Sequence, residues 1–215
     1  MAVGSGSVPD NLFVMDAIPV HRMSDVLDGR NIFLLRVPGA GEYSDGTPFS
    51  HIEYAHRDDY YSFFLVTDGE GRVSIDFREY DFGPNSVHCI MPGQVHRPAS
   101  EIGLAGWFLA VDALLVKSEY KEIFEKKSFS GVPIRASDNE VEELIACLSL
   151  IEGRSGGGID PVERGVTSDL ISAFIGMVAD VCRRDVSASL NNRAAAITLQ
   201  FRSLLSENYR TMKKN

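Results

Sequence analysis

The sequence is poor in cysteine, and the few thiols it has are far apart. Only 3 cysteines occur in 215 residues, at Cys89, Cys147 and Cys182, each within an apolar run. None forms a C-x-x-C pair, which argues against a cysteine-based zinc site. An odd number of dispersed thiols also makes no disulfide scaffold, so we expect reduced, buried cysteines in a cytoplasmic protein.

A basic surface and long apolar runs are missing as well. The formal net charge is −9 and the pI is near 5.0, which argues against a body that holds nucleic acid through a general positive field. No apolar run approaches the roughly 20 residues of a membrane span, and no secretory signal pattern opens the chain. G-x-S-x-G, P-loop and H-E-x-x-H motifs are absent, so those hydrolase and nucleotide chemistries have no support.

What the sequence does contain changes in period near residue 117. Before that point, short apolar runs predict β-strands, among them Ile32–Val37, Tyr60–Thr67 and Val87–Met91. Turn residues separate these runs, as at Phe82–Asn85. Many short strands with such turns predict an antiparallel barrel or sandwich.

One stretch of this β half predicts a turn followed by a half-buried strand. Asp68–Gly71, with the sequence DGEG, has the composition of a turn. After it, Val73, Ile75 and Phe77 alternate with polar and charged residues. Because side chains alternate between the two faces of a strand, all three apolar residues are expected to point inward.

After residue 117 the apolar residues recur with helical spacing. Ser137 and Glu140 form an S-x-x-E capping box, which opens one of the helices. The predicted helices cover Lys117–Lys127, the segment from Ser137 to about Ile151, Asp160–Arg184 and Asn192–Met212. The last three are amphipathic and offer more apolar surface than one barrel covers, so we expect a homodimer formed through helices.

Several short motifs follow one another in the order and spacing of a regulator family. They are His56-Arg-Asp58-Asp59-Tyr-Tyr61, Gly69 and Gly71, Ile75-Asp76-Phe77, Phe82-Gly83-Pro84, Met91-Pro-Gly-Gln-Val-His96 and Gly106-Trp107-Phe108. Together they resemble the N-terminal cupin domain of AraC-type transcription regulators, in which P-G-Q-V-H after a strand is typical. The resemblance implies a mainly β fold, a double-stranded β-helix or cupin jelly-roll barrel, followed by an α-helical dimerisation and linker region.

The resemblance also divides the chain into parts. Residues 1–12 are expected to form a flexible leader, 13–116 the cupin sensor domain, 117–190 the helical linker and 191–215 the start of the first DNA-binding helix. The basic residues of this last part are Arg193, Arg202, Arg210, Lys213 and Lys214. Neither recognition helix follows, so DNA is expected to be a partner only through a helix-turn-helix domain that this sequence does not contain.

A small barrel can hold one small ligand between apolar walls and a few polar groups. At family positions around one opening, the resemblance implies a pocket with His56, Tyr61, His96 and Trp107, and Arg36 if it points inward. A tryptophan face stacks on a sugar ring, while imidazole and phenol groups bond its hydroxyls. The leading hypothesis is a non-enzymatic sensor of a small-molecule effector, with carbohydrate as one candidate and no cofactor. Core filling by Trp107 and a solvent-facing Arg36 are the structural alternatives.

A metal-dependent cupin enzyme, such as a dioxygenase or isomerase, is the alternative function. Metal-binding cupins carry H-x-H, then a glutamate, then a last histidine after the proline-glycine turn. His56 and His96 match this pattern, whereas Asp58 stands at the second histidine and Ser62, a poor metal ligand, at the glutamate. His56, Asp58 and His96 have the order of a two-histidine, one-carboxylate iron site. A third possibility is a barrel that binds nothing and only supports dimerisation.

Overall fold

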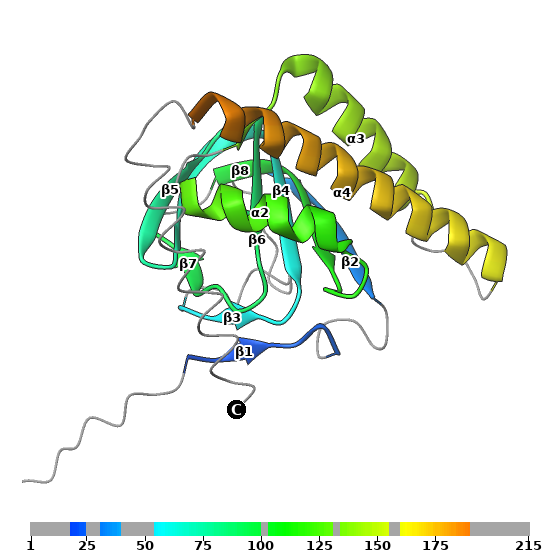
Figure 1. Ribbon diagram of the computed structural model, residues 1–215, viewed down its shortest axis with the longest axis horizontal. Coiled ribbons are helices and arrows are strands. Elements are labelled where there is room, and N and C mark those ends of the chain that lie inside the picture. The colour runs from blue at the N-terminus through cyan, green and yellow to red at the C-terminus, as the bar shows by residue number, and fades with distance from the viewer. Residues whose placement is uncertain are drawn as a thin grey trace, which may run out of the picture.

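The computed structural model describes residues 18–24, 31–39, 54–99, 103–130, 134–154 and 160–189. In these residues, short strands form a barrel and three helices pack along one side of it (Figure 1). The predicted fold class, a mainly β barrel followed by α-helices, is confirmed, and the change from strands to helices falls at residue 117 as expected. The predicted leader 1–12, the segment 191–215 and the helix Asn192–Met212 lie outside the described residues.

The elements follow one another in a simple order along the chain. The strands are β1 (Val20–His21), β2 (Ile32–Pro38), β3 (Arg57–Asp58), β4 (Tyr61–Ile75), β5 (Arg78–Phe82), β6 (Ser86–Ile90), β7 (His96–Pro98), β8 (Gly103–Val111) and β9 (Ile134–Arg135). The helices are α2 (Ser118–Ser130), α3 (Asp138–Glu152) and α4 (Pro161–Ser189).

The long strand β4 belongs to both walls of the barrel. Its first half lies in a sheet of order β2-β8-β4-β6-β9, and its second half pairs with β5 and β7. The predicted turn at Asp68–Gly71 is therefore wrong, because β4 runs through it. A bulge between Val66 and Asp68 bends the strand there. Gly69, with φ 79°, permits the close approach, since a Cβ would lie 1.8 Å from the carbonyl oxygen of Gly103.

The true turn of this hairpin comes later in the sequence. Asp76 and Phe77 have φ of 47° and 66°, the left-handed pair that suits a tight connection between twisted strands. Phe77 is consequently 88% exposed, and its predicted inward position is wrong. Val73 and Ile75 are buried as predicted. The predicted turn at Phe82–Asn85 is confirmed between β5 and β6.

The helices begin and pack much as their sequences predict. The capping box is confirmed, because Ser137 Oγ accepts from the Glu140 amide at 3.4 Å and Glu140 Oε2 accepts from the Ser137 amide at 2.7 Å. α3 buries the stripe that runs from Val141 to Ile151. In α4, Phe174 and the residues around it are buried, whereas the N-terminal turns are exposed.

One described segment, Pro161–Arg184 of α4, is long and apolar enough to cross a membrane by length and composition. Such a single match is weak evidence, because the core helix of a soluble protein meets the same criteria. Phe174, Ile175 and Val178 of this helix are almost fully buried in the core shared with the barrel and α3. The burial of these side chains shows that α4 forms part of that core.

The two faces of the sheet serve different purposes. Tyr61, Phe63 and Leu65 face the helices and form one core with them. Tyr60, Phe64 and Val66, the alternate residues, pack inside the barrel. This period of two separates a helix-facing layer from a barrel interior. Phe63 lies at the centre of the first layer, edge-to-face with Phe124 of α2 at 5.5 Å and with Phe174 of α4 at 6.0 Å.

Candidate functional site

His56 and His96 meet at one end of the barrel, where β3 and β7 lie (Figure 1). Each donates its backbone amide to the carbonyl of the other, at 3.1 and 3.0 Å. Their ring centroids are 4.2 Å apart. The H-x-D motif and the P-G-Q-V-H motif therefore place their histidines together, and we call this end of the barrel the mouth.

Asp58 lies between the two imidazoles and is only 4% exposed. Its Oδ2 accepts a hydrogen bond from Ser62 Oγ at 3.0 Å and lies 3.4 Å from His96 Nε2. Its Oδ1 lies 3.9 Å from His56 Nε2. Among the described residues, Oδ1 is the buried side-chain oxygen that lacks a hydrogen-bond partner. The carboxylate is thus half satisfied in a place that water does not reach.

A third histidine, for which no role was predicted, completes this group. β1 pairs with β3 in parallel and sets His21 opposite Asp58. The His21 ring stacks on His56 with centroids 4.4 Å apart, and its Nδ1 lies 3.8 Å from Asp58 Oδ1. Its Nε2 contacts the hydroxyl of Tyr54 at 3.2 Å. No motif could have pointed to His21, because a pairing between segments so far apart leaves no local pattern.

The surroundings of His56 fix the protonation of its ring. Burial, with smaller contributions from His96 and His21, lowers the pKa of His56 to about 4 against the opposing effects of the Tyr54 carbonyl and Asp58. At neutral pH the ring is therefore uncharged. His56 Nδ1 lies 3.0 Å from the Tyr54 carbonyl oxygen, so the single proton sits on Nδ1 and is donated there. The Nε2 lone pair then faces Asp58.

The other predicted ligand-binding residues do not reach the mouth. Tyr61 and Trp107 are buried in the helix-facing layer. Arg36 is exposed, and its guanidinium lies 5.4 Å from the centroid of the Trp107 ring. These positions correspond to the structural alternatives given with the sequence: Trp107 fills the core, and Arg36 faces solvent.

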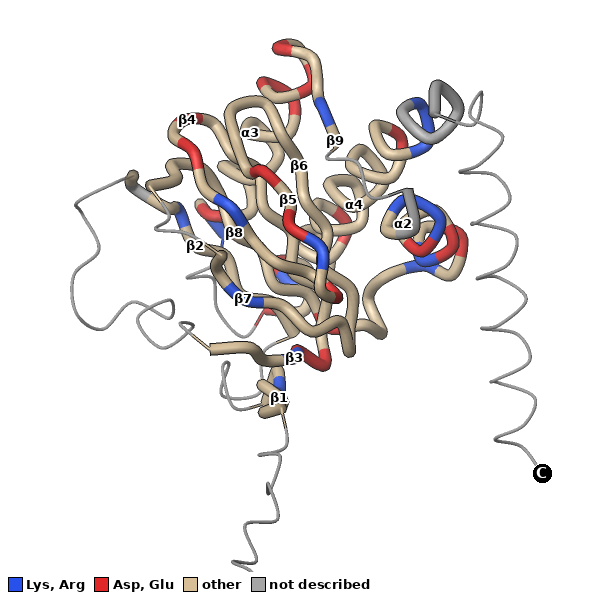
Figure 2. The backbone as a smooth tube through the Cα atoms, turned by 90° about the vertical axis from the view of Figure 1, so that its left-hand side faces the viewer, with Lys and Arg blue, Asp and Glu red and all other residues tan. Residues whose placement is uncertain are grey.

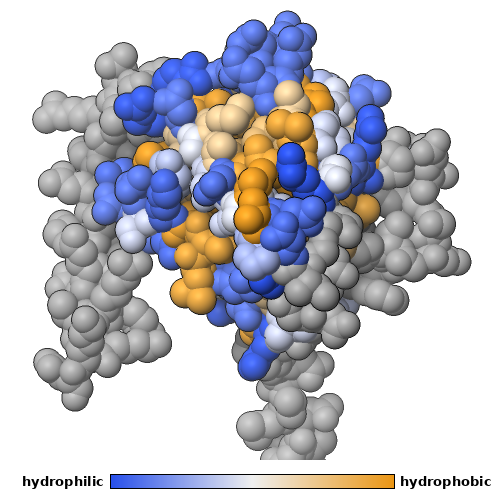
Figure 3. Space-filling model, turned by 90° about the vertical axis from the view of Figure 1, so that its right-hand side faces the viewer, coloured by the Kyte–Doolittle hydropathy of each residue, from blue (hydrophilic) through white to orange (hydrophobic). Residues whose placement is uncertain are grey.

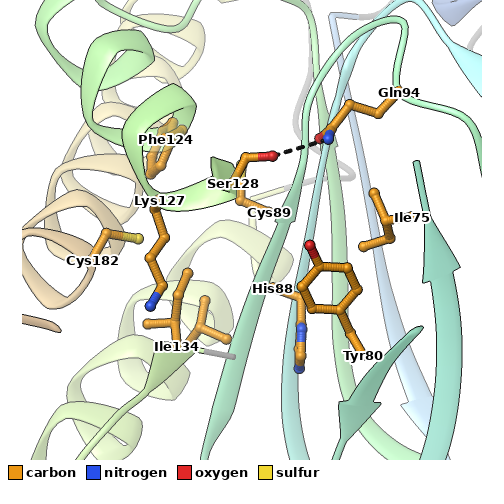
Figure 4. A pocket seen from close by; sticks show the side chains of 11 residues that line it. Ile75, Tyr80, His88, Cys89, Gln94, Phe124, Lys127, Ser128, Ile134 and Cys182 are labelled. Atoms are coloured by element: carbon orange, nitrogen blue, oxygen red, sulfur yellow. Dashed lines mark hydrogen bonds between the residues drawn. The ribbon is translucent and has the colours of Figure 1, made fainter. Parts of the chain in front are cut away.

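A pocket opens elsewhere, between β6 and helix α2 (Figure 4). Its cavity volume is about 40 Å³, and it opens to solvent. The lining residues are Ile75, Tyr80, Val87, His88, Cys89, Gln94, Phe124, Lys127, Ser128, Ile134 and Cys182. Lys127 is 5% exposed although it is a lysine, and lysine is among the side chains most rarely buried. We call this the Lys127 pocket.

The pocket joins the barrel to α2 through a polar contact. Gln94, in the turn before β7, donates from Nε2 to Ser128 Oγ of α2 at 3.0 Å, the bond drawn in Figure 4. The same nitrogen donates to Asp76 Oδ2 at 2.7 Å, and Oε1 accepts from the Met91 amide at 2.8 Å. One hydrogen bond of this buried amide thus reaches α2, while the other two fix the Gln94 side chain to the barrel.

In the sequence His88 alternates with Val87 and Cys89, which predicts a surface or edge position for its side chain, and this prediction is wrong. It is buried, it stacks on Phe82 with centroids 3.4 Å apart, and its Nε2 lies 2.9 Å from Ser86 Oγ. Ser86 Oγ already donates to the Gly83 carbonyl oxygen, so it accepts from His88. Burial, with smaller contributions from Arg135 and Lys127, lowers the pKa of His88 to about 3.

The outer surface of β4, β5 and β7 carries both signs of charge, as Figure 2 shows. Arg72 Nε lies 3.1 Å from Asp81 Oδ1, and Arg72 Nη1 lies 3.3 Å from Glu79 Oε2. Interspersed charges of this kind produce no strong field of one sign. The described residues of these strands therefore form no basic stripe of the kind that binds nucleic acid.

The family model of the AraC-like ligand binding domain matches residues 42–171. The chain belongs to this family. The AraC-like domain is also similar to the crystal structure of the AraC-like transcriptional activator CuxR, with 17% identity and a TM-score of 0.39 over 55% of this chain and 42% of that one. A cupin protein from Bacteroides fragilis, BF4112, shows 16% identity and a TM-score of 0.30 over 45% of this chain and 78% of that one. A comparison with curated proteins found no match.

The family assignment confirms what the motifs around His56 and His96 predicted. An AraC-like ligand binding domain is a ligand-sensing regulatory domain, so the coarse function of this chain follows from its family. The matched residues contain the whole mouth from Tyr54 onward and the whole β6–α2 wall of the Lys127 pocket.

Proposed function

We propose that the chain is the effector-sensing and dimerising part of an AraC-type transcription regulator, with the effector bound in the Lys127 pocket. One observation carries the proposal. Lys127 and His88 are both buried, yet they line a pocket whose walls come from the barrel and from α2. Buried polar groups that converge on a concave, otherwise apolar surface are typical of small-molecule sites.

The lining of the pocket indicates the class of effector. Ile75, Phe124 and Ile134 offer apolar walls. The Lys127 ammonium suits a carboxylate or another anionic group, because charge-assisted hydrogen bonds are the strong ones. We propose a small hydroxylated organic acid, a class that includes the sugar acids. Trp107 lies in the helix-facing layer, so it offers no stacking surface for a neutral sugar at the mouth.

The pocket also suggests how binding is transmitted. A ligand there touches the barrel and α2 at once, and α2 shares the aromatic contact of Phe63, Phe124 and Phe174 with α4. An effector that fits one position of α2 better than another would favour that position. The resulting coupling is limited by the difference between the effector's affinities for the two arrangements.

Replacing Lys127 by methionine tests this site. A panel of hydroxylated acids and the corresponding neutral sugars is screened by the shift in Tm. The best acid should bind the variant about ten- to a hundredfold more weakly than the wild type, because a hydrogen bond to a charged group contributes about 1.5–3 kcal/mol. Lys126→Met is the matched control, since Lys126 is exposed and only 4.0 Å from Glu122 in a surface pair. Equal affinities for both variants, or stabilisation by neutral sugars alone, would contradict the proposed site.

Dimerisation through the helices belongs to the same proposal. Leu150 of α3 and Val162 of α4 are 54% and 71% exposed. Figure 3 looks onto this end of the molecule, and hydrophobic side chains gather there among hydrophilic ones. Exposed apolar clusters of this kind favour association with a second copy.

The double substitution Leu150→Glu, Val162→Glu should therefore convert a dimer to a monomer, as measured by sedimentation equilibrium across a concentration series. Phe77→Glu serves as the control, because Phe77 is even more exposed, at 88%, but lies at the β4–β5 turn. If the double variant retains the mass of a dimer, the interface lies elsewhere.

In the full regulator, we propose that residues 13–116 sense the effector, that 117–190 form the linker, and that a helix-turn-helix domain beyond 191–215 binds DNA in the cytoplasm. No reaction is assigned to the domain. The alternative, a metal-dependent enzyme, is favoured by one observation: His56, Asp58 and His96 do meet. Incubation of each panel compound with protein, followed by NMR of the compound, separates binding from turnover.

A further inference from the structure

The mouth contains a group of ligand atoms that the proposed effector site does not use. His21, His56 and Asp58 each offer one atom, and these three atoms lie within 4.8 Å of one another. His96 Nε2 stands 3.4 Å from the second oxygen of the same carboxylate. None of the four residues lines the Lys127 pocket, so an inference about them is independent of the effector.

The hydrogen bonds around this group leave acceptors facing acceptors. His56 donates its Nδ1 proton to the Tyr54 carbonyl, so its Nε2 lone pair faces Asp58 Oδ1. His96 Nδ1 lies 3.1 Å from the Gln94 carbonyl oxygen, and its Nε2 lies 3.4 Å from Oδ2. Ser62 is a donor to Oδ2, but Oδ1 is buried without any hydrogen bond. A buried acceptor without a donor is costly.

A bound cation removes this conflict, and the donor set indicates which kind. Neutral imidazole nitrogens suit Zn²⁺, Cu²⁺, Ni²⁺ and Fe²⁺, whereas Ca²⁺ and Mg²⁺ prefer oxygen ligands. Two ligands that each lie about 2.0–2.1 Å from one zinc ion are at most about 4.2 Å apart. The separations of Asp58 Oδ1 from His21 Nδ1 and His56 Nε2, 3.8 and 3.9 Å, lie within this limit, and the third separation, between the two imidazole nitrogens, is within 4.8 Å.

The surroundings hold the rings as metal sites require. A metal-bound imidazole commonly donates its other N–H to a carbonyl or similar group, which fixes its orientation. His56 and His96 donate to the carbonyls of Tyr54 and Gln94. His21 Nε2 contacts the Tyr54 hydroxyl, which leaves Nδ1 toward Asp58.

We propose that the mouth binds one divalent transition-metal ion such as Zn²⁺. His21, His56 and Asp58 are the ligands, and His96 lies beside the site, next to the second Asp58 oxygen. Because His21 comes from β1, the ion fastens the segment 18–24 to the barrel. The segment is also held by the pairing of β1 with β3 and by hydrogen bonds that include Arg57 N to Pro19 O at 2.9 Å and Met23 N to Asp59 Oδ1 at 2.7 Å. Burial of Met23 contributes as well, and the ion adds a further attachment at His21. The bound ion would therefore hold the segment 18–24 against the barrel, and we call this attachment the clasp.

The first experiment measures binding to the full 215-residue chain after treatment with a chelator. Zn²⁺ is titrated by calorimetry, and Co²⁺ replaces it as a spectroscopic probe. We expect one ion per chain and Co²⁺ absorption bands of a nitrogen and oxygen site. His21→Ala should weaken binding at least tenfold, whereas Arg22→Ala, an exposed neighbour in the same segment, should leave it unchanged. Failure to bind one ion, or equal affinity of His21→Ala and wild type, overturns the site.

The second experiment tests the clasp itself. Trypsin cleaves after Arg22, and the metal should slow this cleavage at least several-fold in the wild type but not in His21→Ala. Metal binding that leaves the cleavage rate of the wild type unchanged overturns the clasp. His21 is part-exposed, so its substitution removes no buried core. Circular dichroism verifies that the variant is folded, and Asp58→Asn provides a second test of the ligand set where it folds.

Discussion

Replacing Phe63 by alanine is expected to lower the free energy of unfolding by about 3–5 kcal/mol, the usual cost of removing a buried phenyl ring. Phe63 is 1% exposed and contacts both Phe124 of α2 and Phe174 of α4. The cavity would lie where three elements meet, and none of them can close it without leaving the others. Urea denaturation followed by circular dichroism and by tryptophan fluorescence measures the loss.

Phe77→Ala is the matched control, because it removes the same side chain from a position that is 88% exposed. It should change the free energy of unfolding by no more than about 0.5 kcal/mol. Trp107 lies in the same helix-facing layer as Phe63, so its fluorescence reports on that layer directly. A Phe63→Ala protein as stable as Phe77→Ala would mean that the barrel and the helices do not share one core.

Acidification from pH 7 to pH 5 is expected to destabilise the fold by about 2 kcal/mol through His88 alone. The pKa of His88 is about 3 in the folded protein, against about 6.5 in an unfolded chain. The unfolded state therefore binds the proton first, so stability is present above pH 6.5 and falls as the pH drops toward 3. The lowered pKa of His56, about 4, acts in the same direction.

The window from pH 7 to 5 isolates the histidines, because carboxylates with ordinary pKa values near 4 remain ionised there. Urea denaturation at several pH values gives the slope. His88→Gln should remove about half of it, and wild-type stability that is flat across this window would contradict the burial of both rings as neutral groups. His56→Gln supplies the same comparison if His88→Gln does not fold.

The period of the apolar residues predicted a β half followed by a helical half, whereas the choice of a cupin barrel depended on the family resemblance. Alternation before residue 117 and helical spacing after it correspond to strands and helices in the structure. The DGEG segment misled because glycine is common both in turns and where two backbones approach closely. Only the position of Gly103 beside Gly69 decides between these roles. That position is set by the tertiary structure and cannot be read from the local sequence.

The sequence predicted part of the site. The alternation of side chains between the two faces of a strand explains why Tyr61 and Trp107 were wrongly grouped with the mouth. His56, Asp58 and Ser62 share one face of the chain, and the motifs placed His96 opposite them. Tyr61 is offset by one residue and therefore points toward the helices. Counting positions along β4 would have separated it from the mouth using the sequence alone. Trp107 pairs with Leu65 in the register, so the same count places it in the helix-facing layer.

The sequence alone could not predict the positions of the His21 and Lys127 side chains. His21 reaches Asp58 through a parallel pairing of two short strands, and nothing in either strand encodes its partner. Lys127 lies in a helix rich in charged residues, but α2 turns this residue toward the barrel. Both side chains acquire their environments from the packing of whole elements.

The sharing of β4 between both walls of the barrel has a consequence for length variation among natural relatives. Inserting or deleting one residue near the bulge at Asp68 would reverse the orientation of every side chain that follows in the strand. Arg72 and Ser74 would enter the interior, while Val73 and Ile75 would face water. Relatives should therefore differ in length at connections such as the β5–β6 turn, and hardly ever within Tyr61–Ile75.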